Sequence, residues 1–322
     1  MKKLLGLLTI TTLCLLTLAS TTGCGSQEKK AATAPPQVVN ITYVKSPLNI
    51  PSIIDKNINT VSKAFAKTNT KVNFPEINSG AKQTEALAAG SLDICSALGG
   101  TSAILAASNG VDVKIIGIYS RAPQAFNIMS KNPELKTLAD LKGKTVAGPK
   151  GTILHQILLA GLDKAGLQAS DVELLSMDIP PSVTAMLNEN VDAALVAGAD
   201  VLRAQKAGAH ILANGEGLVD ATIVIATSNK FLQTHPEAIK QYLEAHKENI
   251  AFMHKNQAQA YEFTAKATGL QPAEVRAMAP WYNFDPTLTP QDLTELEKTQ
   301  EFLLKAGLQK NKIDIKNLIV KL

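Results

Sequence analysis

Short apolar runs with β-type patterning alternate with helical runs through the first two thirds of the chain. The spacing of Leu154, Ile157, Leu158 and Leu162 is that of one face of a helix. Such alternation predicts an α/β fold with mostly parallel sheets covered by helices. The predicted strands are 39–45, 71–77, 92–97, 112–118, 144–147, 172–177, 191–196 and 222–227.

One segment of this pattern occurs twice. Residues 85–100 resemble residues 184–199: in each, an apolar helix ends at a turn residue and a β-type run opens with an apolar residue followed by Asp. Asp93 then corresponds to Asp192, and Gly99 to Gly198, at the same offset. A second β-type run follows each segment, near Val111 and Ala209. Two similar α/β units predict two related lobes with a ligand cleft between them.

From Thr234 to the C-terminus the sequence predicts helices with no strands between them. Pro236 stands in the first turn of one predicted helix, and Thr289 gives another helix a capped start. We expect these helices to pack onto the first lobe.

The N-terminus has the order of a secretory signal. Lys2 and Lys3 precede an apolar run over 4–20, and small residues lead into Cys24. A retained transmembrane helix is the alternative, but the run is marginal for a hydrocarbon core about 30 Å thick. Residues 21–24 resemble a bacterial lipobox, with Thr21 where Leu is usual. We therefore expect a signal peptide over 1–23, lipidation of Cys24, and a flexible tether over 24–37 at the outer face of the membrane.

Charge and cysteine content narrow the class of protein. The net charge of +4 falls to +2 when the two signal-peptide lysines leave, and the basic residues are scattered, so nucleic acid is not expected as a partner. Cys95 has no second cysteine in the expected mature chain and lies in an apolar run, which predicts a buried, inert thiol.

Several stretches carry a family resemblance: 79–80, 85–93, 99–102, 138–147, 150–152 and 165–167. The string ADLKGKTVA, followed shortly by KGT, resembles the solute-binding proteins of ABC importers for aliphatic sulfonates, taurine, nitrate and the thiamine pyrimidine precursor. The resemblance runs from about Ile41 to the C-terminus. It implies a two-lobed periplasmic-binding-protein fold of type 2, each lobe a mixed sheet flanked by helices.

This resemblance also implies an organisation and partners. Lobe one would comprise 38–122 plus 222–322, and lobe two 123–221, with two crossover segments acting as a hinge. The partners would be a small solute and an importer permease with its ATPase. The protein would be monomeric and would need no cofactor or metal.

Loops after the predicted strands supply the candidate ligand contacts, because ligands of open α/β sheets bind at the carboxyl ends of strands. Exposed N–H groups at helix starts attract an anion, although Gly, Ser and Thr there are also ordinary caps. The expected ligand-binding residues are Ser46, Ser79, Gly80, Gly99, Gly100, Thr101, Ser102, Arg121, Lys150, Gly151, Thr152, His155, Gly198 and Asp200.

Some of these candidates have two interpretations. Asp200 either binds a cationic group or caps the next helix. Arg121 reaches an anion or remains a solvated charge beside the hinge. Trp281 and Tyr282 stack on a ligand or pack among the C-terminal helices. Residues 197–200 stand where many relatives have an aromatic-acid-Pro-Tyr run, so the identity of the solute is not determined. The sequence favours a small organic anion such as a sulfonate.

An enzyme is the less favoured function. The five histidines show no H-E-x-x-H spacing, and the chain has no G-x-S-x-G elbow. A thiamine-pyrimidine-synthase-like enzyme shares the fold, but its Cys-rich motif is absent. A surface lipoprotein with a ligand-sensing or adhesive role is the other alternative to a transport protein.

Overall fold

The computed structural model describes residues 34–322, which form one compact unit. The expected signal peptide, Cys24 and most of the tether lie outside the described residues. Within the described part of the chain, no helix combines the length and the apolar composition that crossing a bilayer requires.

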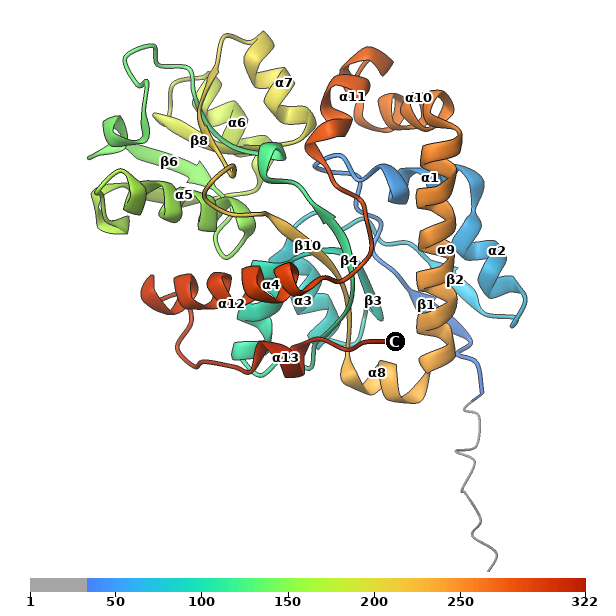
Figure 1. Ribbon diagram of the computed structural model, residues 1–322. Helices are drawn as coiled ribbons and strands as arrows, with labels where there is room; N and C mark the ends of the chain where they lie inside the picture. The colour runs from blue at the N-terminus through green and yellow to red at the C-terminus, as the bar shows by residue number, and fades with distance from the viewer. Residues whose placement is uncertain (1–33) are drawn as a thin grey trace, which may run out of the picture. The chain divides into compact units, whose positions relative to one another are not determined.

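A five-stranded sheet organises the middle of the chain (Figure 1, upper left). Its order is β7-β6-β8-β5-β9; β6 pairs in parallel with β7 and β8, while β5 is antiparallel to β8 and β9. The strands are β5 (Phe126–Ser130), β6 (Thr145–Gly148), β7 (Glu173–Ser176), β8 (Ala193–Ala197) and β9 (His210–Asn214).

Helices cover both faces of this sheet. Ala194 and Val196 of β8 pack in the cluster that holds α6 (Ile179–Leu187) and α7 (Ala199–Lys206), whereas Leu195 packs in the cluster that holds α5 (Ile153–Lys164). Because both faces are buried, β8 is apolar at every position instead of alternating.

The remaining strands form the first lobe. β1 (Val38–Asn40) pairs in parallel with β2 (Lys71–Asn73), and an isolated parallel bridge joins Ile41 to Ile94. A second, antiparallel sheet has the order β3-β10-β4. Its strands are β3 (Ile94–Gly99), β4 (Lys114–Arg121) and β10 (Thr222–Thr227).

The expectation of mostly parallel sheets is therefore wrong, and the sheets are mixed. The reason is the path of the chain between the lobes. β4 leads into the second lobe, and β10 returns from it to lie between β3 and β4, antiparallel to both. The two-lobed fold with mixed sheets and flanking helices, which the resemblance implied, is confirmed.

The C-terminal helices pack on the first lobe, as expected. α9 lies against α1 and α2, and α12 lies against α4 (Figure 1). Thr289 caps α12 in a reciprocal box with Asp292. The helices are α1 (Ile50–Ile58), α2 (Thr60–Ala66), α3 (Gly80–Ala88), α4 (Gly100–Ser108), α8 (Asn229–Thr234), α9 (Pro236–Lys255), α10 (Gln257–Thr268), α11 (Pro272–Met278), α12 (Pro290–Lys305) and α13 (Ile315–Leu318).

The repeated segment forms the same unit in both lobes: α3-β3-α4 in the first and α6-β8-α7 in the second. Asp93 accepts a hydrogen bond from the Asn40 N–H at 2.7 Å, and Asp192 accepts one from the Thr145 N–H at 2.9 Å. Each aspartate thus holds the neighbouring strand in place, which explains why Asp recurs at this offset.

The free thiol of Cys95 lies inside the first lobe, as the apolar run predicted. It is fully buried, and burial raises its pKa to about 12. A thiol with so high a pKa is protonated at neutral pH and is a poor nucleophile.

Candidate functional site

A cleft of about 650 Å³ lies between the two lobes, and both contribute to its walls. A cavity of this size is in the usual range for small-molecule sites. Of the residues predicted to bind ligand, seven line it: Ser46, Ser79, Gly80, Gly99, Ser102, Thr152 and Asp200.

At least five helices of eight or more residues begin at this cleft. Two prolines remove N–H donors from the first turn of α6, and the first N–H of α7 is used by the Pro47 carbonyl, so α3, α4 and α5 have the most N–H groups to offer. α3 starts after Ser79, α4 after Gly99 and α5 after Thr152, and no side chain caps any of the three. The first N–H groups of a helix have no partner within the helix, and they carry its partial positive charge. The cleft therefore offers hydrogen-bond donors and a favourable potential to an anion.

The starts of α3 and α4 lie close together because residue 80 is glycine. A Cβ at Gly80 would lie 2.5 Å from the Ser102 hydroxyl, so a larger residue would displace this side chain. Ser102 in turn donates a hydrogen bond to the Gly151 carbonyl of the second lobe at 3.0 Å. This contact joins the three helix starts into one wall.

A second contact between the lobes needs Gly198. This residue has φ of +57°, and a Cβ there would lie 1.9 Å from the Pro47 carbonyl oxygen of the first lobe. The next N–H, that of Ala199, donates to the same oxygen at 3.2 Å. The backbone of one lobe thus rests directly on the backbone of the other.

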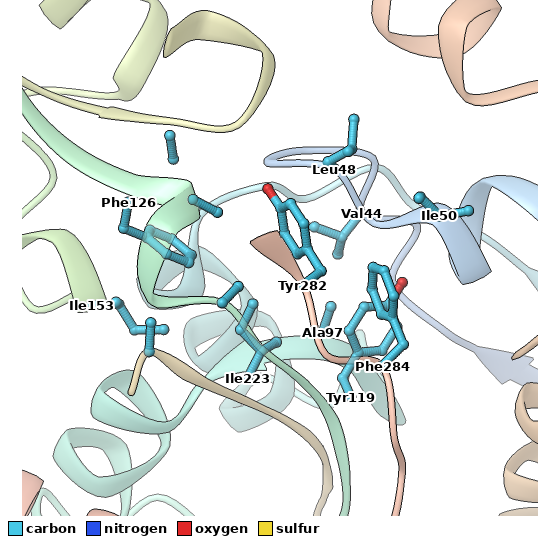
Figure 2. Close-up of a cluster of buried hydrophobic side chains, with 14 of the residues drawn as sticks. Val44, Leu48, Ile50, Ala97, Tyr119, Phe126, Ile153, Ile223, Tyr282 and Phe284 are labelled. Atoms are coloured by element: carbon cyan, nitrogen blue, oxygen red, sulfur yellow. The ribbon is translucent and has the colours of Figure 1, made fainter. Parts of the chain in front are cut away.

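Much of the cleft wall is apolar. Phe126 and Ile153 come from the second lobe, and Ala97 and Ile223 come from the first. Figure 2 labels these four side chains within a cluster of buried hydrophobic residues. Ile179 adds to the wall from the start of α6. An apolar wall of this extent suits a ligand with a hydrocarbon portion.

The charged side chains of the wall are paired within the protein. Lys82 meets Asp178 across the lobes at 2.8 Å, and Asp200 meets Arg203 at 2.7 Å. Glu76 meets Lys45 at 2.9 Å, and the hydrogen bond from this lysine lowers the pKa of Glu76. Asp200 lies in the first turn of α7, whereas Gly198 holds the cap position, so the alternative that Asp200 caps the helix is wrong.

Arg121 lies outside the cleft wall, at the end of β4, where the chain passes to the second lobe. Its guanidinium forms an ion pair with Asp292 at 2.5 Å and donates to the carbonyl oxygens of Asp285 and Thr287. Burial would raise the pKa of Asp292, but hydrogen bonds from Arg121 and Thr289 outweigh burial and hold that pKa below its usual value. Arg121 thus binds the C-terminal segment to β4 and is not a solvated charge.

A buried hydrogen-bond chain also crosses between the lobes. The Thr101 hydroxyl donates to Gln156 Oε1 at 2.5 Å, and Gln156 Nε2 donates to Thr299 Oγ1 at 3.1 Å. Gly100 lines a smaller cavity at the same place. Thr101 and Gly100 therefore hold α4, α5 and α12 together and lie away from the cleft.

His155 braces the loop before α5. Its Nδ1 accepts a hydrogen bond from the Gly151 N–H at 3.2 Å, and burial lowers the pKa of His155 to about 4, so the ring is neutral near pH 7. Lys150 is exposed on the same loop.

The wall of the cleft also contains residues that were not predicted from the sequence. Among them, Pro180 and Pro181 follow a predicted strand and could have been selected by the strand-end rule, whereas Asn49, Gln83 and Phe126 gave no such signal.

Comparison with known proteins gives a family and named relatives. A family model described as NMT1/THI5 like matches residues 65–260. A protein of Escherichia coli (strain K12) named "Putative aliphatic sulfonates-binding protein" is 27% identical over 294 residues, which cover 90% of each chain. A protein of the same name from Bacillus subtilis (strain 168) is 27% identical over 276 residues, 84% of this chain and 82% of that protein.

A solved structure shows the same fold. The alkanesulfonate-binding protein SsuA from Xanthomonas axonopodis pv. citri, bound to MOPS, superposes with a TM-score of 0.82. The match covers 90% of this chain and 100% of that chain, at 24% sequence identity. At this identity, the likeness speaks for the fold alone.

Proposed function

Because the chain belongs to the NMT1/THI5-like family, we propose that it is the extracytoplasmic solute-binding component of an ABC importer. Its ligand is a small organic anion, sulfonates foremost. Two relatives that carry a sulfonate-binding name match over most of their length. The protein acts as a monomer and delivers its solute to a permease that an ATPase drives.

The observation that carries this proposal is the cleft itself. Helix starts without a side-chain cap, among them those of α3, α4 and α5, meet at a cavity of about 650 Å³ between two lobes. A sulfonate or carboxylate at these N–H groups gains charge-assisted hydrogen bonds without a lysine or arginine. The apolar wall then accommodates the hydrocarbon portion of the ligand.

The proposed contacts are divided between the lobes. Ser46, Ser79, Gly80, Gly99 and Ser102 belong to the first lobe, and Thr152 and Asp200 belong to the second. Solute binds first to one lobe, and closure brings the contacts of the other. The ligand favours the closed state only through those added contacts.

Arg121, Gly100, Thr101, Lys150, Gly151, His155 and Gly198 have supporting roles in this proposal. This assignment is supported by the ion pair of Arg121 with Asp292, the hydrogen bonds of Thr101 and of the Gly151 carbonyl between the lobes, and the hydrogen bond of His155 in the loop before α5.

A thermal-shift screen of the purified protein tests the proposal. The panel holds sulfonates, nitrate, amino acids, purines and thiamine precursors. We expect sulfonates to raise the melting temperature, since a ligand that binds only the folded state stabilises it by mass action. A panel in which no compound shifts the melting temperature would refute the binding function.

Export and anchoring form a separate part of the proposal. A signal peptide over 1–23 and an acylated Cys24 would hold the protein at the outer face of the membrane. We expect the Cys24→Ala variant to leave the membrane fraction and to lose incorporation of labelled fatty acid, since no acyl acceptor remains. A variant that stays membrane-bound and labelled would refute lipidation at Cys24 and would leave the ligand proposal untouched.

A further inference from the structure

Of the three carboxylates in the cleft wall, that of Asp200 is the least exposed. Its side chain is 16% exposed, against 42% for Glu76 and 51% for Asp178. A charge that is shielded from water acts more strongly on its neighbours, so an unpaired Asp200 would repel an anion in the same cavity. Binding of an anion therefore depends on the group that pairs with this carboxylate.

That group is the guanidinium of Arg203, which binds two partners at once. Its Nη1 donates to Asp200 Oδ1 at 2.7 Å, and its Nη2 donates to the carbonyl oxygen of Thr268. Asp200 and Arg203 lie one turn apart on α7 of the second lobe, whereas Thr268 belongs to α10 of the first lobe. One side chain thus connects a carboxylate of the cleft to the opposite lobe.

The end of α10 is a favourable place for this cation. Thr268 is the last residue of the helix, so its carbonyl has no partner within the helix and carries part of the negative end of the helix dipole. The next residue is Gly269, with φ of +73°, and a Cβ there would lie 3.5 Å from Arg203 Nη2. The guanidinium therefore lies directly against the helix end, with no side chain of residue 269 between them.

A second cation of α7 makes a contact between the lobes without reaching the cleft. Lys206, one turn after Arg203, forms an ion pair with Glu274 of α11. Neither member of this pair lines the cleft. The two contacts are neighbours on the same helix, and they differ in that only Arg203 also binds a carboxylate of the cleft wall.

We propose that Arg203 is a positioning residue that links closure of the lobes to the charge of the cleft. When the lobes are together, the end of α10 holds the guanidinium against Asp200 and the carboxylate is neutralised. When the lobes separate, the Thr268 carbonyl moves away, and Arg203 keeps only a pair on its own helix, which is weak.

The consequence concerns which state an anion favours. In the closed form an anionic ligand meets a neutralised Asp200, and in the open form it meets a carboxylate that is less well paired. The anion therefore gains from closure beyond its own contacts with the second lobe. This inference rests on the proposed function, and it adds to it a residue outside the cleft wall that favours anions.

Double-mutant cycles test this role by calorimetric titration, with 1-propanesulfonate and 1-hexanesulfonate as probes. Arg203→Met removes the charge and keeps much of the length of the side chain, and the variant is expected to fold because Arg203 is 52% exposed. We expect it to weaken sulfonate binding about fivefold or more, since the charge of Asp200 is no longer offset. In the Asp200→Asn background, the same substitution should weaken binding at least about threefold less.

Lys206→Met is the matched control. It removes the neighbouring contact between the lobes and one positive charge, but it leaves the pairing of Asp200 intact. Its effect on sulfonate binding should therefore be the same, within about twofold, with and without Asp200→Asn.

The outcomes are distinct. If Arg203→Met weakens binding equally in the two backgrounds, Arg203 is only a contact between the lobes, so this inference is overturned while the proposed function stands. If Lys206→Met depends on Asp200 as strongly as Arg203→Met does, loss of positive charge in general explains the effect, and the assignment to Arg203 is overturned. If neither sulfonate binds the wild type, the proposed function fails for these sulfonates, and this inference fails with it.

Discussion

Gly198 shows how one residue without a Cβ allows two lobes to touch. Its backbone adopts φ of +57°, which side-chain-bearing residues rarely adopt, and it lies against the Pro47 carbonyl. In the repeat within this sequence, Gly198 corresponds to Gly99. The repeat alone could not show that one glycine starts a helix while the other also packs against a distant loop.

We expect Gly198→Ala to lower the free energy of unfolding by about 3 kcal/mol or more, through backbone strain and the clash with Pro47. Urea unfolding measures the change. Gly208→Ala is the matched control. Gly208 lies just after the end of α7, the helix that Gly198 precedes; it also has positive φ, +90°, but has open space around it. It should cost about 1 kcal/mol. Equal losses in the two variants would show that the contact between the lobes adds nothing.

His246 is a second residue with a measurable signature. It is buried between the rings of Tyr119 and Tyr242, its Nε2 has no protein partner, and burial lowers its pKa to about 4. The unfolded chain, in which a histidine titrates near pH 6.5, therefore binds a proton over a range where the folded protein does not. Stability contributed by the neutral ring is lost as the pH falls from about 6.5 towards 4.

We expect the wild type to lose about 2 kcal/mol more unfolding free energy than His246→Phe between pH 7 and pH 5. Denaturant titration at the two pH values measures this difference. His254→Gln, on the exposed side of the same helix, controls for removal of a histidine as such. If the wild type and His246→Phe lose the same amount, His246 does not titrate in this way.

The lining residues of the cleft show the limit of sequence reasoning at this scale. Ser79, Gly99 and Thr152 could be predicted, because residues after strands open helices at the cleft edge of an α/β sheet. Gln83 and Asn49 could not. Their amide nitrogens bind carbonyl groups of Ser46, Ile77 and Ala97, which only the folded chain brings near them.

At the scale of elements, the starts of α3, α4 and α5 are the features on which the proposed anion binding depends. Thr152 holds the cap position of α5, with extended backbone, yet its hydroxyl donates to Pro149 and caps nothing. A side chain at this position that accepts a hydrogen bond from the first turn of α5 would change both the stability of the helix and the electrostatic potential in the cleft.

The pair Thr152→Asp and Thr152→Asn separates these two effects. Both side chains are good caps, so both variants should match or exceed the stability of the wild type. Only the aspartate places a negative charge at the proposed anion site, and we expect it to weaken sulfonate binding at least about tenfold relative to the asparagine. Calorimetry and thermal melts measure the two quantities. Equal affinities would show that the anion is bound elsewhere.

Most elements could be predicted from the chain, and the exceptions have physical causes. Each of the eight predicted strand ranges contains an observed strand or part of one. β5 was missed, because Phe126–Ser130 contains a buried asparagine and ends in serine, so its run of apolar residues is short and interrupted. Strand direction was also missed, since it depends on where the chain crosses between lobes and not on local pattern.

At the scale of the whole molecule, polar contacts hold the lobes together away from the cleft. Lys305 of α12 meets Asp163 of α5 at 2.8 Å, and Lys206 of α7 meets Glu274 of α11. These charges are mostly exposed, so each pair contributes less than about 1 kcal/mol. An opening motion that separates α5 from α12 would break the first of these pairs.

We expect Lys305→Glu to weaken ligand binding by up to about fivefold, because repulsion from Asp163 disfavours the closed state. Neither residue lines the cleft, so the ligand is not affected directly. The swap Lys305→Glu/Asp163→Lys should restore affinity, and 1 M salt should remove the difference. Calorimetric titration at low and high salt measures both. Wild-type affinity in the single variant at low salt would contradict this role.

The apolar wall around Phe126 and Ile153 also determines how the enthalpy of binding changes with temperature. A ligand that covers this wall removes hydrocarbon surface from water, which gives the association a negative heat-capacity change. The binding enthalpy then becomes more exothermic on warming, and it passes through zero at some temperature although the affinity there is undiminished. A calorimetric search for the natural solute at one temperature would miss a ligand whose enthalpy vanishes there, so such a search should be run at two temperatures.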